Sequence, residues 1–550
     1  MSHGMQAAAV AGLMMHSAGA QPATVPVPVL ETTEIEVDVG ALPKSERAAL
    51  TWIIRAARQM DAVYLRQVWP DSIRQKKLRE SASNPAAHAE LTALEYFKGP
   101  WNSQGEAFIA EVPAKRPIGD FYPADSSKAE LETWLNSLAE GERKRALDPF
   151  TAVRRTQGSP FELVRYSRYY APELKLAAND LRMAANLTRE PTLQRYLRAR
   201  ARALLDDNYY ASDVAFVGLK GPIDVVLGPN EADDDSWFGV KTAFEASIAI
   251  VNEPATRRIS GVTEHLQELE EHLPLAVTLR GRQLAGAAPV LVLDVVYHGG
   301  MAAARGGAAA GYGLPNDLRV QNAVGARTGT YRNILESRYQ GTFRPIADAV
   351  LASSDQANLQ FNDIVDEILL VRLFDSLGPQ VVTGTTRSIA DALQGNAAAA
   401  AQIRSMLLSL WGHRYLIEHG YRERREAGPM YAAFLIPALA RIRGGLGSSS
   451  SQGSTYVLNH LIEAGAIHAD ATGRFAIDAA RGDAEIERAA GEFISLMASG
   501  DAVAVEALLH RYVVISPEVQ AALARAGAPP PARAFFYLTA EQLDPADGHK

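Results

Sequence analysis

Residues 290–297, with the sequence VLVLDVVY, form the most strongly strand-like stretch of the chain. Its valines favour extended backbone, and a short, nearly continuous apolar run is typical of a strand buried on both faces. Two earlier runs have a similar composition, IDVVL at residues 223–227 and ASIAIV at residues 246–251. Together the three runs predict a buried sheet in the middle of the chain.

On both sides of this sheet the apolar residues recur with a helical period. Helices are predicted before it, between residues 45 and 205, around a loop-rich stretch at residues 98–125. An alanine- and glycine-rich loop follows the third strand at residues 299–313. After residue 350 helices dominate again, at residues 361–377, 389–413, 430–442, 457–464 and 486–509. The predicted fold class is α+β and predominantly helical, with a mixed strand core in the first lobe and a mainly helical second lobe.

This pattern divides the chain into four segments. They are a disordered or signal segment at residues 1–30, the mixed lobe at 31–325, the helical lobe at 326–515 and a C-terminal tail at 516–550. Residues 7–15 are apolar and precede SAGA at residues 17–20, which resembles a signal-peptide cleavage site, although no Lys or Arg precedes them. We therefore expect a periplasmic or secreted protein. The alternative is a cytoplasmic one whose first residues are a cloning remnant.

Composition excludes several function classes. The 550 residues carry a net charge of −8, and no basic face suited to a phosphate backbone is evident, so nucleic acid is not an expected partner. The chain has no cysteine, which rules out disulfides, thiolate nucleophiles and cysteine metal sites. No apolar run reaches the roughly 20 residues that span a bilayer. A phosphate-binding loop and a G-x-S-x-G serine elbow are both absent, and the serines at 448–451 are interpreted as a mobile loop.

Seven motifs are too specific to follow from periodicity. They are DPFT at 148–151, DNYYASD at 207–213, PIDV at 222–225, GPNE at 228–231, WFGVKTAFE at 237–245, LPND at 314–317 and NILESRY at 333–339. In this order they resemble the bacterial branch of the dipeptidyl-peptidase III family, which are zinc exopeptidases. The resemblance extends from about residue 45 to about residue 515 and implies two lobes around a wide cleft, with the zinc in the helical lobe.

The zinc-binding motif of this family is degenerate here. An H-E-L-x-H-x-L-G-P helix places two histidines on one face and a glutamate beside the metal-bound water. The corresponding residues 371–379 read VRLFDSLGP, so Val371 and Asp375 stand at the histidine positions and Arg372 at the glutamate position. The third ligand comes from an E-E-A-K-A-D-x-x-G-L-W stretch, which reads AQIRSMLLSLW at residues 401–411. A further family histidine corresponds to Ser450. The resemblance therefore implies a chain without the zinc site, and we expect no cofactor.

Other histidines offer weaker metal candidates. His265, Glu268 and His272 share one helix face, although a solvated acidic helix is the simpler interpretation. His413 and His419 lie around a helix end, where ordinary surface or capping roles are favoured.

The candidate site is the family cleft. The catalytic candidates are Asp375 or Glu336 as a base, Arg372 as a stabiliser of negative charge, and His298 at the end of a buried strand. The alternative is a buried ion-pair network that replaces the lost dication. Substrate-binding candidates are Asn316, Asp317, Arg319, Gln321, Asn322, Glu231 and Arg338.

Three functions remain open at this point. The first is a metal-independent enzyme that uses the cleft for acid–base chemistry on a small organic or peptide-like substrate. The second is a noncatalytic pseudopeptidase that binds peptides or a partner protein, and the third is an active zinc dipeptidyl peptidase. The sequence does not specify the oligomeric state.

Overall fold

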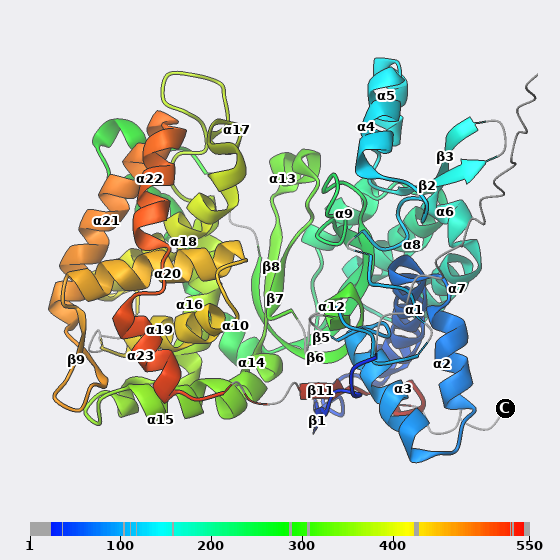
Figure 1. Cartoon of the computed structure of the whole chain (residues 1–550), viewed down its shortest axis with the longest axis horizontal. Helices are drawn as coiled ribbons and strands as arrows, with labels where there is room; N and C mark the ends of the chain where they lie inside the picture. The colour runs from blue at the N-terminus through cyan, green and yellow to red at the C-terminus, as the bar shows by residue number, and fades with distance from the viewer. Residues whose placement is uncertain are drawn as a thin grey trace, which may run out of the picture.

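The structure is a computed structural model that describes residues 24–543, apart from 36, 103–104, 111, 117, 157–158, 285–288, 305–308, 423–427, 529, 531–532 and 539. Figure 1 shows the helical lobe on the left and the lobe with the central sheet on the right. The leader predicted from residues 7–20 lies outside the described residues. None of the helices in the described ranges has the length and apolar character that crossing a bilayer requires.

The first lobe is built on a five-stranded mixed sheet with the order β4-β5-β6-β8-β7. β6 and β8 pair in parallel, while the other neighbours are antiparallel. The strands are β4 (Ile223–Glu231), β5 (Ala243–Val251), β6 (Val290–Gly300), β7 (Gly311–Leu314) and β8 (Arg327–Tyr331). The three strands predicted from apolar runs are confirmed, and each is longer than its run.

The sheet is curled, so that its two ends approach each other. Asp224 lies on β4 at one end of the strand order, yet it contacts residues of β7 and β8 at the other end. It accepts hydrogen bonds from Tyr312 Oη at 2.9 Å and from Arg327 Nε at 2.8 Å. Both partners of the ion pair are buried, so removing either would leave an uncompensated charge.

Helices cover the outside of this sheet. α1 packs against β5 and β6 and against α7, and it buries an apolar stripe that includes Ile53, Ala57 and Met60. The helices of this lobe are α1 (Lys44–Val68), α2 (Ser72–Glu80), α3 (Pro85–Phe97), α4 (Lys128–Ser137), α5 (Glu140–Ala146), α6 (Tyr166–Tyr169), α7 (Ala171–Leu187), α8 (Pro191–Asp206), α9 (Tyr210–Val217), α12 (Met301–Ala304) and α13 (Leu318–Val324). A separate hairpin joins β2 (Thr151–Thr156) and β3 (Ser159–Arg165).

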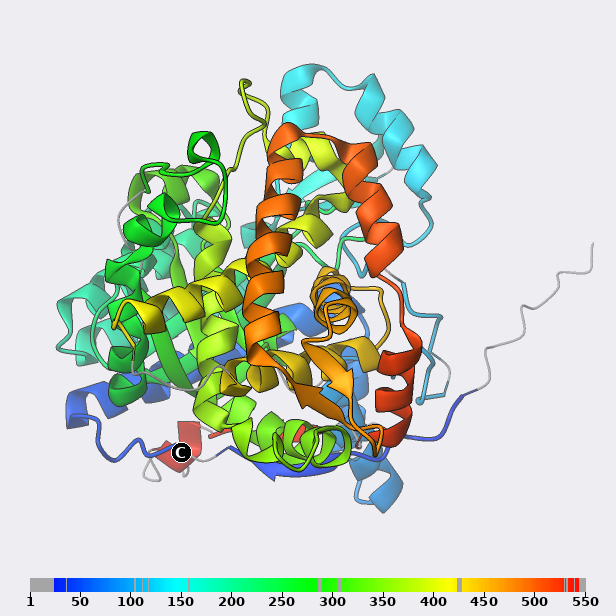
Figure 2. The ribbon, with the colours of Figure 1, turned by 90° about the vertical axis from the view of Figure 1, so that its left-hand side faces the viewer.

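The second lobe has its own apolar core. Its elements are α14 (Arg332–Arg338), a π-helical turn (Tyr339–Phe343), α15 (Arg344–Val350), α16 (Phe361–Leu373), a 3-10 turn (Phe374–Ser376), α17 (Ile389–Leu393), α18 (Ala397–Glu418), α19 (Gly428–Arg443), α20 (Ser449–Glu463), the short strands β9 (Ile467–Ala469) and β10 (Phe475–Ile477), α21 (Ala479–Ser499), α22 (Ala502–Tyr512) and α23 (Pro517–Arg525). Figure 2 shows α21 and α22, in orange, side by side on the outer face.

Two earlier helices belong to this second core. α10 (Glu253–Glu264) and α11 (Leu266–Glu271) precede the boundary expected at residue 325. Their buried residues Ile259, Leu269 and Leu273 nevertheless pack with the helices of the second lobe. The chain therefore crosses between lobes more than once, which a division by sequence position does not describe.

Several predicted elements have different limits in the structure. The predicted helix at 389–413 is interrupted at Gln394, whose φ is 50°, and the one at 486–509 is interrupted at Gly500, whose φ is 74°. The serines expected as a mobile loop instead begin α20, because Ser448 and Ser451 form a reciprocal capping box. The predicted glycine-rich loop contains α12 and β7 within its described part.

The C-terminal segment returns to the first lobe rather than ending as a tail. β11 (Arg533–Phe536) pairs in parallel with β1 (Glu31–Glu34), and α24 (Ala540–Leu543) packs on α1. Figure 1 shows β1 and β11 together below the sheet. The two ends of the described chain are therefore joined on one lobe.

Candidate functional site

A cavity of about 860 Å³ lies between the sheet and the helices of the second lobe. Strands β4, β5, β7 and β8 contribute residues to one side, and helices α14, α16, α18, α19 and α20 contribute to the other. Its size falls within the range of about 300–1,000 Å³ that is usual for small-molecule sites. The cavity is the strongest candidate site among the described residues because polar and charged groups from both lobes converge on it.

Residues from each stretch that matches a zinc-site motif of the family line this cavity. They are Val371, Arg372 and Asp375 of residues 371–379, Gln402 of residues 401–411, and Ser450. Ser450 Oγ donates a hydrogen bond to Gln402 Oε1 at 3.2 Å, so these two neutral side chains satisfy each other.

The fold is similar to that of proteins with solved structures. No protein-family profile matches the chain. The structure of dipeptidyl-peptidase III from Corallococcus sp. strain EGB is 34% identical, covers 94% of this chain and 97% of its own, and superposes with a TM-score of 0.82. The chain belongs to the dipeptidyl-peptidase III family.

Two further matches are more distant in sequence. Dipeptidyl-peptidase III from Caldithrix abyssi is 27% identical, with a TM-score of 0.88 over 94% of this chain and 99% of its own. Nudix hydrolase 3 of Arabidopsis thaliana is 27% identical over 89% of this chain and 70% of its own length. The two solved dipeptidyl-peptidase III structures match the two-lobe fold along nearly the whole chain.

The residues at the family's metal position do not fit a zinc ion. Valine has no ligand atom, and Arg372 places a permanent positive charge where a dication would lie. Within the described ranges, no group of three or more His, Asp or Glu side chains is arranged to hold a metal. The donors at the site itself, Asp375, Gln402 and Ser450, include a single carboxylate.

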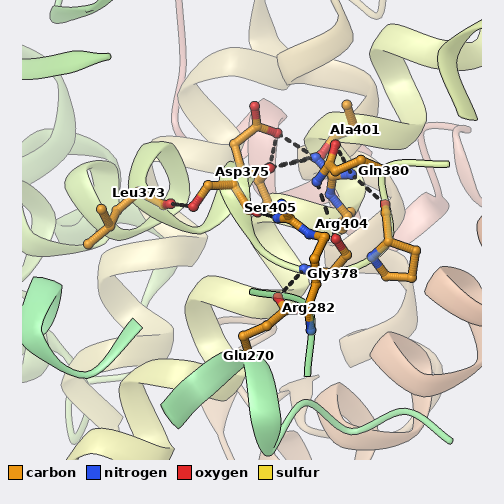
Figure 3. A network of polar contacts seen from close by, with 11 residues as sticks. Glu270, Arg282, Leu373, Asp375, Gly378, Gln380, Ala401, Arg404 and Ser405 are labelled. Carbon is orange, nitrogen blue, oxygen red and sulfur yellow. Dashed lines mark hydrogen bonds and ion pairs between the residues drawn. The ribbon is translucent and has the colours of Figure 1, made fainter. Parts of the chain in front are cut away.

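Asp375 is held by side chains of α18. Its Oδ1 accepts hydrogen bonds from Arg404 Nη2 at 2.9 Å and from Ser405 Oγ at 2.8 Å. Arg404 Nη2 also donates to the Asp375 carbonyl at 2.7 Å. Figure 3 shows these contacts above the turn that contains Gly378. The Arg404 side chain is 6% exposed and the Asp375 side chain 56%, so the pair connects the protein interior to the cavity.

The turn after Asp375 is fixed by a buried carboxylate. Glu270 on α11 accepts hydrogen bonds from Gly378 N at 2.7 Å and from Arg282 N at 3.3 Å. Burial raises the pKa of Glu270 above its ordinary value, against the lowering effect of these bonds. The Arg282 guanidinium donates to the carbonyl of Ser376. Figure 3 labels Glu270, Arg282 and Gly378, and the contacts together fix the position of the turn.

Arginines from three helices form the cationic side of the cavity. They are Arg338 on α14, Arg372 on α16 and Arg441 on α19. Burial lowers the pKa of each, and to about 10 for Arg441, where the nearby charges of Arg338 and Arg372 lower it further. In this part of the dipeptidyl-peptidase III fold, the chain therefore concentrates positive charge on partly buried side chains.

Carboxylates from the sheet form the opposite side. Glu231 on β4 and Glu245 on β5 both line the cavity, and Asn230 Nδ2 donates to Glu245 Oε1 at 2.9 Å. The charge of Glu231 raises the pKa of Arg372, which partly offsets the effect of burial. The cavity thus has an acidic wall on the first lobe and a basic wall on the second.

Two of the four catalytic candidates do not line the main cavity. Glu336 is not among the lining residues and pairs with Arg332 at 3.4 Å, one turn earlier on the same helix. His298 is buried on β6, where its Nδ1 lies 2.8 Å from Ser247 Oγ, and it lines a second, smaller cavity with Asp61 and Tyr297. Burial lowers the pKa of His298 to about 3, so it is neutral and a weak base. Only Arg372 and Asp375 of this group reach the cavity.

The polar run after β7 also lies outside the cavity lining. Asn316 donates to the Asn230 carbonyl at 2.9 Å, and Gln321 donates to the Pro315 carbonyl at 2.8 Å. Asp317 caps α13 and pairs with Arg319 at 2.6 Å, and Asn322 is exposed. These side chains organise a turn and a helix start. Of the substrate-binding candidates, Glu231 and Arg338 are the two that line the cavity.

Sequence reasoning missed several lining residues. Glu245 and Ser247 alternate with apolar neighbours on a buried strand, and polar residues at such positions are a usable signal. Arg441 and Arg443 lie in the last turn of an otherwise apolar helix. Basic residues are common at helix C-termini, so their position in the sequence does not indicate a binding site. Only the packing of α19 against α16 brings Arg441 to the cavity.

The histidines and the glutamate considered as alternative metal ligands make hydrogen bonds and ring contacts with protein groups. Glu268 Oε1 accepts hydrogen bonds from Tyr415 Oη at 3.0 Å and Tyr421 Oη at 3.1 Å. His265 stacks on Tyr421 with ring centroids 3.5 Å apart, and His272 Nδ1 bonds the Glu268 carbonyl at 2.8 Å. His413 is buried within α18, and His419 Nδ1 bonds the Tyr415 carbonyl.

Proposed function

We propose that this chain binds a peptide-like ligand in the cavity between its lobes without zinc and without cleaving it. The observation that carries the proposal is the pairing of an acidic wall, Glu231 and Glu245, with a basic wall at the family's metal position. Opposed walls of this kind complement a molecule with separated positive and negative ends. The relatives with solved structures are dipeptidyl peptidases, which makes a peptide the natural ligand class.

Binding is favoured over chemistry by the state of the candidate bases. Asp375 is engaged by Arg404 and Ser405 through one carboxylate oxygen, so part of its capacity to accept hydrogen bonds is already occupied. Glu336 and His298 do not line the cavity, and a general base has to lie within hydrogen-bond reach of the proton that it removes. A rigid, polar binding site uses the same residues without requiring a proton to move.

The test is affinity selection with an equimolar mixture of short peptides. The protein is incubated with the mixture with and without EDTA, separated from unbound peptides, and the retained peptides are identified by mass spectrometry. We expect peptides to be retained, recovered intact, and unaffected by the chelator. Hydrolysis that EDTA abolishes would contradict the proposal and support a zinc peptidase, whereas no retention would contradict binding.

A matched pair of variants links retention to the cavity. Ala440 lines the cavity on α19, so Ala440→Trp would fill part of it. Ala390 is an exposed alanine on α17, so Ala390→Trp introduces the same side chain elsewhere. Retention should fall for the first variant and persist for the second.

One observation favours a metal-independent enzyme as a second candidate. Asp375 lines the cavity beside Arg372, and its side chain remains 56% exposed despite its partners. Its second carboxylate oxygen could therefore accept a proton from a bound substrate. Conversion of a retained peptide in the presence of EDTA, lost in Asp375→Asn, would support this candidate.

A further inference from the structure

We infer that the ligand of this cavity carries a free carboxylate, and that Arg338, Arg372 and Arg441 bind it. The inference rests on the proposed function and narrows the ligand to short peptides with an unblocked C-terminus. Such peptides present an ammonium group to the acidic wall and a carboxylate to the basic one.

The arrangement of the guanidinium groups points to an absent anion. Arg372 makes no hydrogen bond and no ion pair with any residue in the described ranges. Arg441 Nη1 donates to the neutral Ser454 Oγ at 3.2 Å, and no carboxylate within the described ranges lies in ion-pair contact with it. Both side chains are partly buried, and a charge that is largely removed from water is costly unless it is paired. A ligand anion between these side chains would supply the missing partner.

Mutual repulsion strengthens this argument. After burial, the largest unfavourable influences on the charged form of Arg441 are Arg338 and Arg372 themselves. The charge of Glu367 acts in the opposite direction and is the larger single influence, but this buried carboxylate does not line the cavity and is itself held by Ser409. One anion placed among the three guanidinium groups would relieve their repulsion at once.

A carboxylate suits this wall better than a bulky polyanion. Guanidinium groups bind carboxylates through two parallel hydrogen bonds, which gives direction as well as charge. The apolar side chains of Leu335, Phe343 and Val371 also line the cavity, and Glu231 and Glu245 would repel a ligand of high negative charge. A zwitterion with a short apolar body satisfies all of these surfaces.

If the cavity binds both termini of a peptide, its size also limits the length of that peptide. The acidic and basic walls belong to one cavity of about 860 Å³, so a ligand must fit its two termini within it. We therefore expect dipeptides and tripeptides to bind, and longer chains to bind less well. Recognition of a free carboxylate at this point differs from cleavage, in which the chain continues beyond the reacting carbonyl.

The test compares two libraries on the intact protein. One is an equimolar library of dipeptides with free C-termini, and the other holds the matching C-terminal amides. We expect the free acids to be retained and the amides to bind at least about tenfold more weakly, since hydrogen bonds between charged groups are stronger than neutral ones. Inorganic phosphate is added in a separate arm as a competitor that carries charge without a peptide.

Variants assign the effect to the arginines. Arg372→Met keeps an unbranched side chain and should reduce retention of the acids more than retention of the amides. Arg372→Lys should restore part of the difference. Arg257→Met is the control, because Arg257 is 69% exposed on α10 and pairs with Glu253. Circular dichroism confirms that each variant is folded.

The outcomes separate this inference from the proposed function. Equal retention of acids and amides, or an equal effect of Arg372→Met on both, would overturn the inference and leave peptide binding intact. Retention of neither library would overturn both. Saturable binding of phosphate with no retention of either library would identify an inorganic anion site, which also overturns the inference.

Discussion

Glu367 is the buried group whose removal should change stability most clearly with pH. It lies on α16, one turn before Val371, and is 4% exposed. Its Oε1 accepts a hydrogen bond from Ser409 Oγ at 2.7 Å, whereas Oε2 is buried and has no partner within the described part of the chain. Burial raises the pKa of Glu367 to about 7, against the opposing charges of Arg441 and Arg422.

Whether the free energy of unfolding rises or falls with pH depends on which state, folded or unfolded, binds the proton of Glu367 more tightly. Between the ordinary pKa of 4.5 and about 7, the folded state keeps the proton and the unfolded state has lost it. The free energy of unfolding therefore has its full contribution from this group below pH 4.5 and declines until about pH 7. Because one pKa unit corresponds to about 1.4 kcal/mol, the total decline is about 3 kcal/mol.

Glu367→Gln removes this titration and keeps the shape of the side chain. We expect the stability of the variant relative to wild type to rise by about 3 kcal/mol as the pH increases from 4.5 to 7 and then to stay constant. Urea unfolding followed by far-UV circular dichroism at a series of pH values gives this difference directly. Other carboxylates contribute equally to both proteins and cancel.

A second variant controls for the loss of a carboxylate. Glu336 is 47% exposed and pairs with Arg332 on the protein surface, so Glu336→Gln should change stability by less than about 0.5 kcal/mol at every pH. A difference between wild type and Glu367→Gln that is flat across this pH range would refute the reasoning. A difference of opposite sign would show that the arginines, not burial, dominate.

Three further predictions follow from the same contacts. Purified protein incubated with zinc and dialysed should retain far less than one equivalent by elemental mass spectrometry, and a stoichiometric metal would mean that a site was overlooked. Asp224→Ala should destabilise the protein by about 3–5 kcal/mol, because it leaves the buried Arg327 without its carboxylate partner. Asp375→Ala should cost about 1 kcal/mol or less, because the Asp375 carboxylate is largely exposed, and urea unfolding compares the two variants. Gly412→Ala should cost about 1–3 kcal/mol, since a Cβ would lie 2.3 Å from the Phe374 ring, and a thermal midpoint equal to wild type would show that the ring moves freely.

The central strands could be predicted because each is an apolar run buried on both faces. β7, with the sequence GYGL, has no such run, and it forms because β8 offers backbone partners over Arg327–Tyr331. The capping role of Ser448 was missed because a serine-rich stretch has the composition of a flexible loop, while the reciprocal bonds with Ser451 are specific to the structure. Composition thus identifies elements stabilised by burial better than those stabilised by pairing or capping.

The site was predictable only where a family motif marked it. Arg372 and Asp375 could be placed in the cavity because residues 371–379 match the metal helix. Glu336 was expected there because it lies in the family motif at residues 333–339. In the structure it pairs with Arg332, and its neighbours on the helix line the cavity instead. Arg441 carries no motif, so its approach to the cavity depends on how α19 packs, which periodicity does not encode.

The Leu-Gly-Pro sequence that survives in this chain is explained by structure rather than by catalysis. Gly378 has a φ of 78°, a left-handed conformation that glycine adopts without strain. Its N–H donates to the buried Glu270, so the turn also completes a hydrogen bond that would be costly to lose. Neither requirement involves a metal, and both persist when the ligand positions hold Val371 and Asp375. The motif therefore reports that the fold is retained, while the residues before it determine what the cavity can bind.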